Sequence, residues 1–174
     1  VPVEGMMTTT KTRMGAQAEV SPSGAGEPAI LDGVIVIGAG AAGLAAAHAL
    51  VTAGMTTQIL EREQRLAEPW HRRHDNLHLN THRDLSRLPG ASYPAGTPAF
   101  PHRGAVIRHL NEFAEMHRLP VAFGVEVDEI AFRGDHWLLR TSEGLKAARH
   151  VVIATGRDRQ PFIPTWKGME DFSG

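Results

Sequence analysis

Three glycines and one glutamate have the types and spacing to bind a nucleotide. Gly38, Gly40 and Gly43 form the pattern G-x-G-x-x-G, and Glu61 follows at roughly the 20-residue distance where an acid can bind ribose hydroxyls. In this pattern the first glycine permits a tight turn, the second lets the backbone approach a pyrophosphate, and the third allows close packing of a helix on a strand. The predicted phosphate-binding segment is Gly38, Ala39, Gly40, Ala41, Ala42 and Gly43.

The elements that must position these residues can also be read from the sequence. Residues 34–37 are a short apolar, β-branched run typical of a strand buried on both faces. An alanine-rich helix is expected from residue 41 to about Gly54, followed by a second strand over residues 56–61. The free N–H groups and positive dipole end of that helix would face the phosphates. The alternative is a tight turn between strand and helix that binds no ligand.

Glu61 also indicates which nucleotide fits. A carboxylate at this place would repel a 2′-phosphate, so FAD or NAD fits better than NADP.

The rest of the chain departs from regular alternation of strands and helices. Residues 62–102 form a long, proline-containing polar connection, which is unusual in a compact domain unless it is functional. A helix is expected over 102–117, then a strand and a three-stranded antiparallel meander over 121–150, with a last strand at 151–154 that returns to the parallel sheet. The predicted fold class is α/β, a Rossmann-like domain with a parallel sheet and an inserted meander.

Composition limits the function classes. The chain has 174 residues, a formal net charge of −1, 42% hydrophobic residues and no cysteine. These values suit one soluble domain, give no reason to expect a nucleic-acid partner, and leave no disulfide or redox-active cysteine pair. We expect a cytoplasmic location, although the lack of cysteine does not itself indicate the compartment. No apolar run approaches the roughly 20 residues of a membrane span. Residues 1–31 are predicted to be a disordered leader, and residues 32–174 a partial FAD-binding domain.

Four histidines in the long connection could suggest a metal site. His71, His74, His78 and His82 include H-x-x-x-H spacings, which would place two imidazoles on one face of a helix. The segment from His74 to His82 instead alternates with period two, so its histidines would be spread along an extended chain. We therefore expect no metal, and interpret these residues as loop histidines near a negatively charged cofactor.

Several segments together resemble the N-terminal FAD segment of the flavin-containing monooxygenase family, which includes Baeyer–Villiger and N-hydroxylating relatives. The resemblance covers roughly residues 32–174. It rests on "VIGAGAAGLAAA" (36–47), "LERE" (60–63), Trp70 in "EPWHRRHDNLHLNT", "FPHRGAVIRHLNEFAE" (100–115) and "VVIATGRDRQPFIPTWKGMEDFSG" (151–174).

The resemblance implies roles for individual residues. Glu61, with its neighbour Arg62, would lie at the adenosine ribose, and Trp70 along the flavin or its ribityl chain. Val127 would offer backbone contacts to the adenine. Asn80, in "LNTHR", would lie beside the reactive face of the flavin, where a hydrogen-bond donor and exclusion of water would help the reaction with oxygen. Ala154, Thr155 and Gly156 would pass close to the cofactor.

The resemblance also predicts an incomplete enzyme. In the family, an NADPH-binding domain with a second glycine motif follows, whereas this sequence contains one such motif. The closing Phe172–Gly174 resembles the start of the family signature F-x-G-x-x-x-H. The parent is expected to use NADPH, FAD and O₂ to oxygenate a small organic substrate, and this chain alone to lack that activity. The alternatives are a non-catalytic dinucleotide-binding remnant, or another FAD-dependent oxidoreductase such as an amine oxidase or a ferredoxin reductase-like protein. No pattern indicates an oligomeric state.

Overall fold

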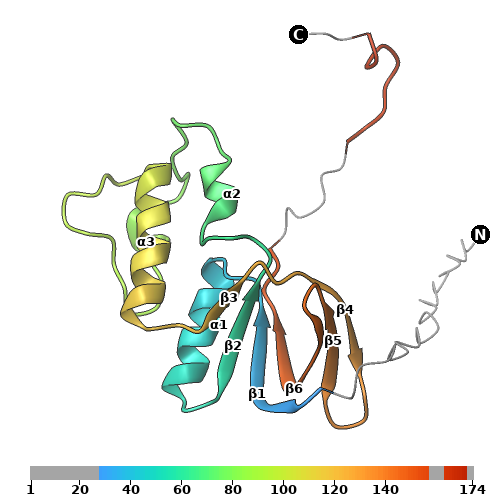
Figure 1. The fold of residues 1–174 in the computed structure, drawn as a ribbon. Helices are drawn as coiled ribbons and strands as arrows, with labels where there is room; N and C mark the ends of the chain where they lie inside the picture. The colour runs from blue at the N-terminus through green and yellow to red at the C-terminus, as the bar shows by residue number, and fades with distance from the viewer. Residues whose placement is uncertain (1–27, 157–162, 172–174) are drawn as a thin grey trace, which may run out of the picture.

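The computed structural model describes residues 28–156 and 163–171. Residues 30–153 form one sheet with helices packed against it (Figure 1). The elements in chain order are β1 (Ile30–Ile37), α1 (Ala41–Thr52), β2 (Thr57–Glu61), α2 (Glu68–His71), the 3₁₀ turn η1 (Arg83–Leu85), α3 (Arg103–Met116), β3 (Val121–Phe123), β4 (Val127–Phe132), β5 (Trp137–Thr141) and β6 (Gly144–Ile153). Residues 1–27, most of the predicted leader, lie outside the described residues, as do 157–162 and 172–174, which carry part of the family resemblance.

The six strands are ordered β3-β2-β1-β6-β5-β4. β3, β2, β1 and β6 run parallel to one another, whereas β5 is antiparallel to both β6 and β4. The α/β class is therefore confirmed, with a sheet that is mixed rather than purely parallel.

β1 is the centre of the core because alternate side chains point to opposite faces of a strand. Val34 and Val36 pack with residues of α1 and α3, including Phe113, which is 1% exposed. Ile35 and Ile37 pack on the other face with residues of β2, β5 and the β3–β4 connection. The prediction of a strand buried on both faces is confirmed, and β1 begins four residues earlier than expected, at Ile30.

The helices follow from their sequences. α1 ends at Thr52, just before Gly54, whose φ of 78° is one that glycine adopts easily. α3 buries one face through Val106, Leu110, Phe113 and Ala114. It begins after His102, whose Nδ1 accepts a hydrogen bond from the backbone N–H of Gly104 at 3.0 Å. The limits expected for both helices are confirmed to within two residues.

The meander forms, but it is not a separate insertion. Its third strand and the strand predicted to return to the parallel sheet are one strand, β6. Ala147 and Ala148 pair with β5 on one side and with β1 on the other. No glycine or proline interrupts the chain between Ala148 and Val151, so one strand continues where two were expected.

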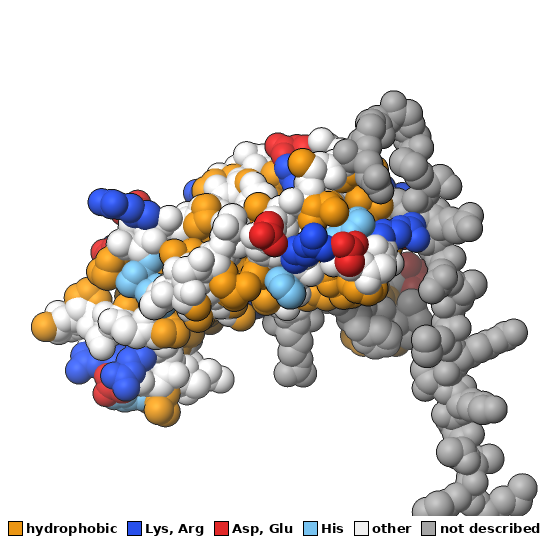
Figure 2. Space-filling model, turned by 90° about the horizontal axis from the view of Figure 1, so that it is seen from below, with side chains coloured by type: hydrophobic (Ala, Val, Ile, Leu, Met, Phe, Trp, Pro, Cys, Tyr) orange, Lys and Arg blue, Asp and Glu red, His pale blue; other side chains and the backbone are white. Residues whose placement is uncertain are grey.

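The connection over 62–102 also contains more structure than expected. It holds α2 and η1, and α2 packs against α3. None of the helices in the described ranges has the length and apolar character needed to cross a bilayer. Figure 2 views the molecule from below Figure 1, the side opposite the carboxyl ends of the parallel strands, and shows side chains of both charges interspersed with hydrophobic ones.

Candidate cofactor-binding site

A cavity of about 840 Å³ opens at the carboxyl ends of β1 and β2. Ligands of open α/β sheets bind at this edge, outside the ends of the parallel strands. Most of the residues predicted from the sequence line the cavity: Gly38, Ala39, Gly40, Glu61, Arg62, Trp70, Asn80, Val127, Ala154, Thr155 and Gly156. Segments far apart in the chain therefore meet around a single hollow.

Two glycines of the loop are required by close packing within the protein. A Cβ on Gly43 would lie 1.9 Å from the carbonyl oxygen of Gly38, which shows how closely α1 approaches the loop. A Cβ on Gly38 would lie 2.6 Å from the carbonyl oxygen of Ala154, and its φ of 101° also favours glycine. These two positions build the turn itself.

Gly40 is different. It precedes α1 with an ordinary φ of −74°, and a Cβ there would meet no atom within 4 Å. Neither backbone conformation nor neighbouring protein atoms explain a glycine at this position. Gly40 lines the cavity, so the open space beside it is where a ligand can approach the backbone. This is the observation on which the fit of a dinucleotide phosphate rests.

The start of α1 adds hydrogen-bond donors to that space. Leu44 makes the first backbone hydrogen bond of the helix, to the carbonyl oxygen of Gly40 at 2.9 Å, and no side chain caps this end. Ala41, Ala42 and Gly43 occupy the first turn, where N–H groups have no partner within the helix. They lie beside the cavity lining rather than in it, so they would contribute through the backbone.

Glu61 connects the glycine loop to the end of β2. One carboxylate oxygen accepts from the backbone N–H of Ala39 at 2.7 Å, and the other from that of Glu63 at 3.0 Å. A carboxylate has further lone pairs, so it can also accept from ribose hydroxyls. Glu61 thus holds the loop in shape and remains available to a ligand in the cavity.

The wall opposite the glycine loop comes from the long connection. α2 brings half-buried Trp70 to the cavity, and Leu77, His78, Leu79 and Asn80 continue the wall. Asn80 has an exposed side chain there. Trp70 and Asn80 were predicted from the family resemblance. The other residues of this wall between Arg65 and Leu79 were not, because α2 is only four residues long and has no periodic pattern.

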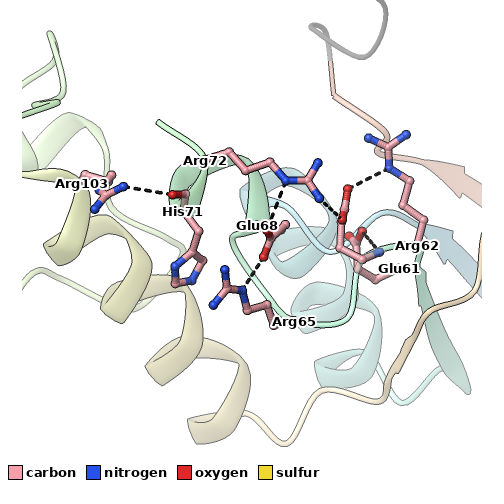
Figure 3. Close-up of polar contacts among 8 residues, drawn as sticks. Glu61, Arg62, Arg65, Glu68, His71, Arg72 and Arg103 are labelled. Carbon is pink, nitrogen blue, oxygen red and sulfur yellow. Dashed lines mark hydrogen bonds and ion pairs between the residues drawn. The ribbon is translucent and has the colours of Figure 1, made fainter. Parts of the chain in front are cut away.

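Ion pairs occupy much of the rim (Figure 3). Arg72 on the α2 side contacts Glu63 at 2.7 Å and Glu68 at 3.2 Å, and Arg62 contacts Glu63 at 3.3 Å. Arg65 also pairs with Glu68, and its hydrogen bond lowers the pKa of that carboxyl. These charges largely neutralise one another.

The histidines do not come together. His78 contacts the carbonyl oxygen of Asn76 at 2.9 Å and packs its ring against His102, with ring centroids 5.1 Å apart, whereas His82 lies beside Asp84. Within 28–156 and 163–171, no group of three histidine or acidic side chains could hold a metal ion.

Comparison with known proteins identifies the family. A model described as pyridine nucleotide-disulphide oxidoreductase matches residues 35–173. The chain belongs to this family. Dithiol chemistry needs a pair of cysteines. The sequence contains none, so these residues cannot carry out that chemistry.

Flavin monooxygenases are among the similar proteins. The chain is 34% identical over 146 residues to an indole-3-pyruvate monooxygenase, YUCCA1, of Oryza sativa subsp. japonica, a match that covers 82% of this chain and 36% of the rice protein. A flavin-containing monooxygenase from Stenotrophomonas maltophilia is 30% identical, with a TM-score of 0.74, over 82% of this chain and 43% of that one.

A more distant structure shares the fold. OTEMO, solved in complex with FAD and NADP, is 22% identical with a TM-score of 0.67, over 84% of this chain and 29% of that one. The flavin monooxygenases that are 34% and 30% identical to this chain confirm the resemblance to the N-terminal FAD-binding segment of that family. The chain spans about a third of the length of the curated relatives it matches.

Proposed function

We propose that this chain forms the FAD-binding part of an NADPH-dependent flavin monooxygenase that oxygenates a small organic substrate in the cytoplasm. The FAD-binding domain, predicted over residues 32–174, would also include Ile30 and Leu31, with which β1 begins. The observation that carries the proposal is the open space beside Gly40, in a cavity that Glu61 and Trp70 also line. The similarity to flavin monooxygenases supports the type of reaction.

Each part of the cavity suits a part of the cofactor. The Gly38–Gly43 loop and the start of α1 would bind the pyrophosphate through backbone N–H groups, and Glu61 would accept from the adenosine ribose. Val127 would lie at the adenine, while Trp70, Asn80 and the Ala154–Gly156 segment would enclose the flavin. FAD, when bound, supplies the redox chemistry with NADPH and O₂. This chain's residues would orient it and exclude water.

The test is a titration of the purified chain with FAD, followed by flavin fluorescence and repeated with Gly40→Val. We expect saturable binding by the wild type and at least about tenfold weaker binding by the variant, a loss of about 1.4 kcal/mol. The reason is that the added side chain fills the space in which the pyrophosphate would lie.

Ala49→Val is the matched control, since Ala49 is an exposed residue on the same helix, outside the cavity lining. It should bind FAD as the wild type does, and circular dichroism should show both variants folded. Absence of FAD binding by the folded wild type, or equal binding by Gly40→Val, would contradict the proposal.

A further inference from the structure

Resting on the proposed function, we propose that Arg73 binds the pyrophosphate of the cofactor through its guanidinium. Arg73 lines the same cavity as Gly38 and Gly40, on the opposite wall. It is not part of the glycine motif, and neither residue spacing nor the family resemblance predicted a contact with FAD there.

The first argument is that the other arginines at the cavity are already paired with carboxylates. Arg62 and Arg65 also line it, but each has a carboxylate partner, Glu63 and Glu68 respectively. In the part of the chain that the structure describes, no ion pair or side-chain hydrogen bond is found for Arg73. Its full positive charge is therefore available to an anion in the cavity.

The second argument is that the backbone of Arg73 is firmly placed. Arg103, the first residue of α3, donates from Nη1 to the carbonyl oxygens of Arg73 at 2.6 Å and His71 at 3.0 Å, and from Nη2 to Asp75. The contact between Arg103 and His71 is visible in Figure 3. These hydrogen bonds of Arg103 hold the backbone of the turn after α2 in place. The backbone of Arg73 therefore has a defined position on the cavity wall, and its side chain can reorient toward a ligand.

The third argument is chemical. Backbone N–H groups of the glycine loop are neutral donors, whereas the pyrophosphate of FAD carries negative charge that needs compensation. Glu61 adds a further negative charge to the same cavity. A guanidinium presents paired N–H donors that match phosphate oxygens, and such charge-assisted hydrogen bonds are roughly twice as strong as neutral ones.

The experiment compares Arg73→Gln with wild type in binding to FAD, to ADP, which keeps the pyrophosphate, and to adenosine, which lacks it. We expect Arg73→Gln to weaken FAD and ADP binding about tenfold, as for loss of a hydrogen bond to a charged group, and to leave adenosine binding within about twofold. Arg73→Lys should retain part of the FAD and ADP affinity because it retains the charge.

Arg72→Gln is the matched control. It removes the same charge from the adjacent residue, whose guanidinium is already held by Glu63 and Glu68. An equal loss of FAD affinity in both glutamine variants would overturn the inference, as would an equal loss of adenosine affinity in Arg73→Gln.

The measurements distinguish failure of the inference about Arg73 from failure of the proposed FAD-binding function. If wild type binds FAD, Gly40→Val does not, and Arg73→Gln binds as tightly as wild type, the FAD site stands and the role of Arg73 is refuted. If folded wild type binds no FAD, both are refuted.

Discussion

Individual residues of the glycine motif serve different purposes, although the sequence pattern treats them alike. Gly43 is required by the protein itself, since any side chain there would collide with the backbone of Gly38. A Cβ added at Gly40 would meet no protein atom within 4 Å, so under the proposed function a side chain there would obstruct only the ligand. A substitution at Gly43 should therefore lower mainly the stability of the fold, whereas one at Gly40 should weaken mainly ligand binding.

We expect Gly43→Ala to lower the free energy of unfolding by about 3 kcal/mol, because the loop and α1 would have to move apart. Gly40→Ala should cost less than about 1 kcal/mol, the usual effect of alanine before a helix. Urea denaturation of the two variants measures this difference. Similar unfolding midpoints would contradict the assignment of Gly43 to close packing.

At the scale of the element, α3 carries a histidine in the core. His109 is 5% exposed, its Nε2 accepts from the backbone N–H of Leu88 at 3.3 Å, and Tyr93 stacks on its ring with centroids 4.2 Å apart. Burial lowers the pKa of His109, against an opposing effect of the nearby Glu112 charge. Burial therefore favours the neutral form of the imidazole through which α3 contacts Leu88 and Tyr93.

The sign of the pH dependence follows from that shift. Since the unfolded chain takes up a proton at His109 at higher pH than the folded one, this contribution to stability is present above about pH 6.5 and is lost as the pH falls through the lower folded pKa. We expect urea midpoints of the wild type to fall between pH 7 and pH 5, and His109→Gln, which keeps a hydrogen-bond acceptor, to show a shallower fall. Equal slopes would show that His109 does not contribute.

At the scale of the whole molecule, β6 makes the parallel sheet and the meander one unit. Leu139 of β5 is fully buried and packs in one cluster with Ile35 and Ile37 of β1. We expect Leu139→Ala to cost about 2–5 kcal/mol and to lower one common unfolding transition, seen alike by near- and far-ultraviolet circular dichroism. Leu85→Ala, at a position that is 83% exposed, should have little effect. Separate transitions for meander and sheet would contradict the single unit.

An element could be predicted from the sequence where the residue pattern that specifies it lies within one short segment. The strand, turn and helix around Gly38–Gly43 and the limits of α3 were predictable because periodicity and glycine positions lie within short segments. α2 was not, since a four-residue helix is stabilised mainly by its packing on α3. The absence of a carboxylate partner for Arg73 within the described ranges was equally hidden, because ion pairs depend on which loops meet.

The sequence by itself therefore determined the glycine turn between β1 and α1, its flanking elements and the family, through residue types whose physical constraints are local. Only the tertiary structure decided that Gly40 faces open space while Gly43 is packed, and that β6 joins the meander to the parallel sheet. It also decided that several separate segments between Ile37 and Gly156 line one cavity. The physical reason is that strand pairing, burial and charge pairing are set by contacts between segments distant in the chain, which no local pattern encodes.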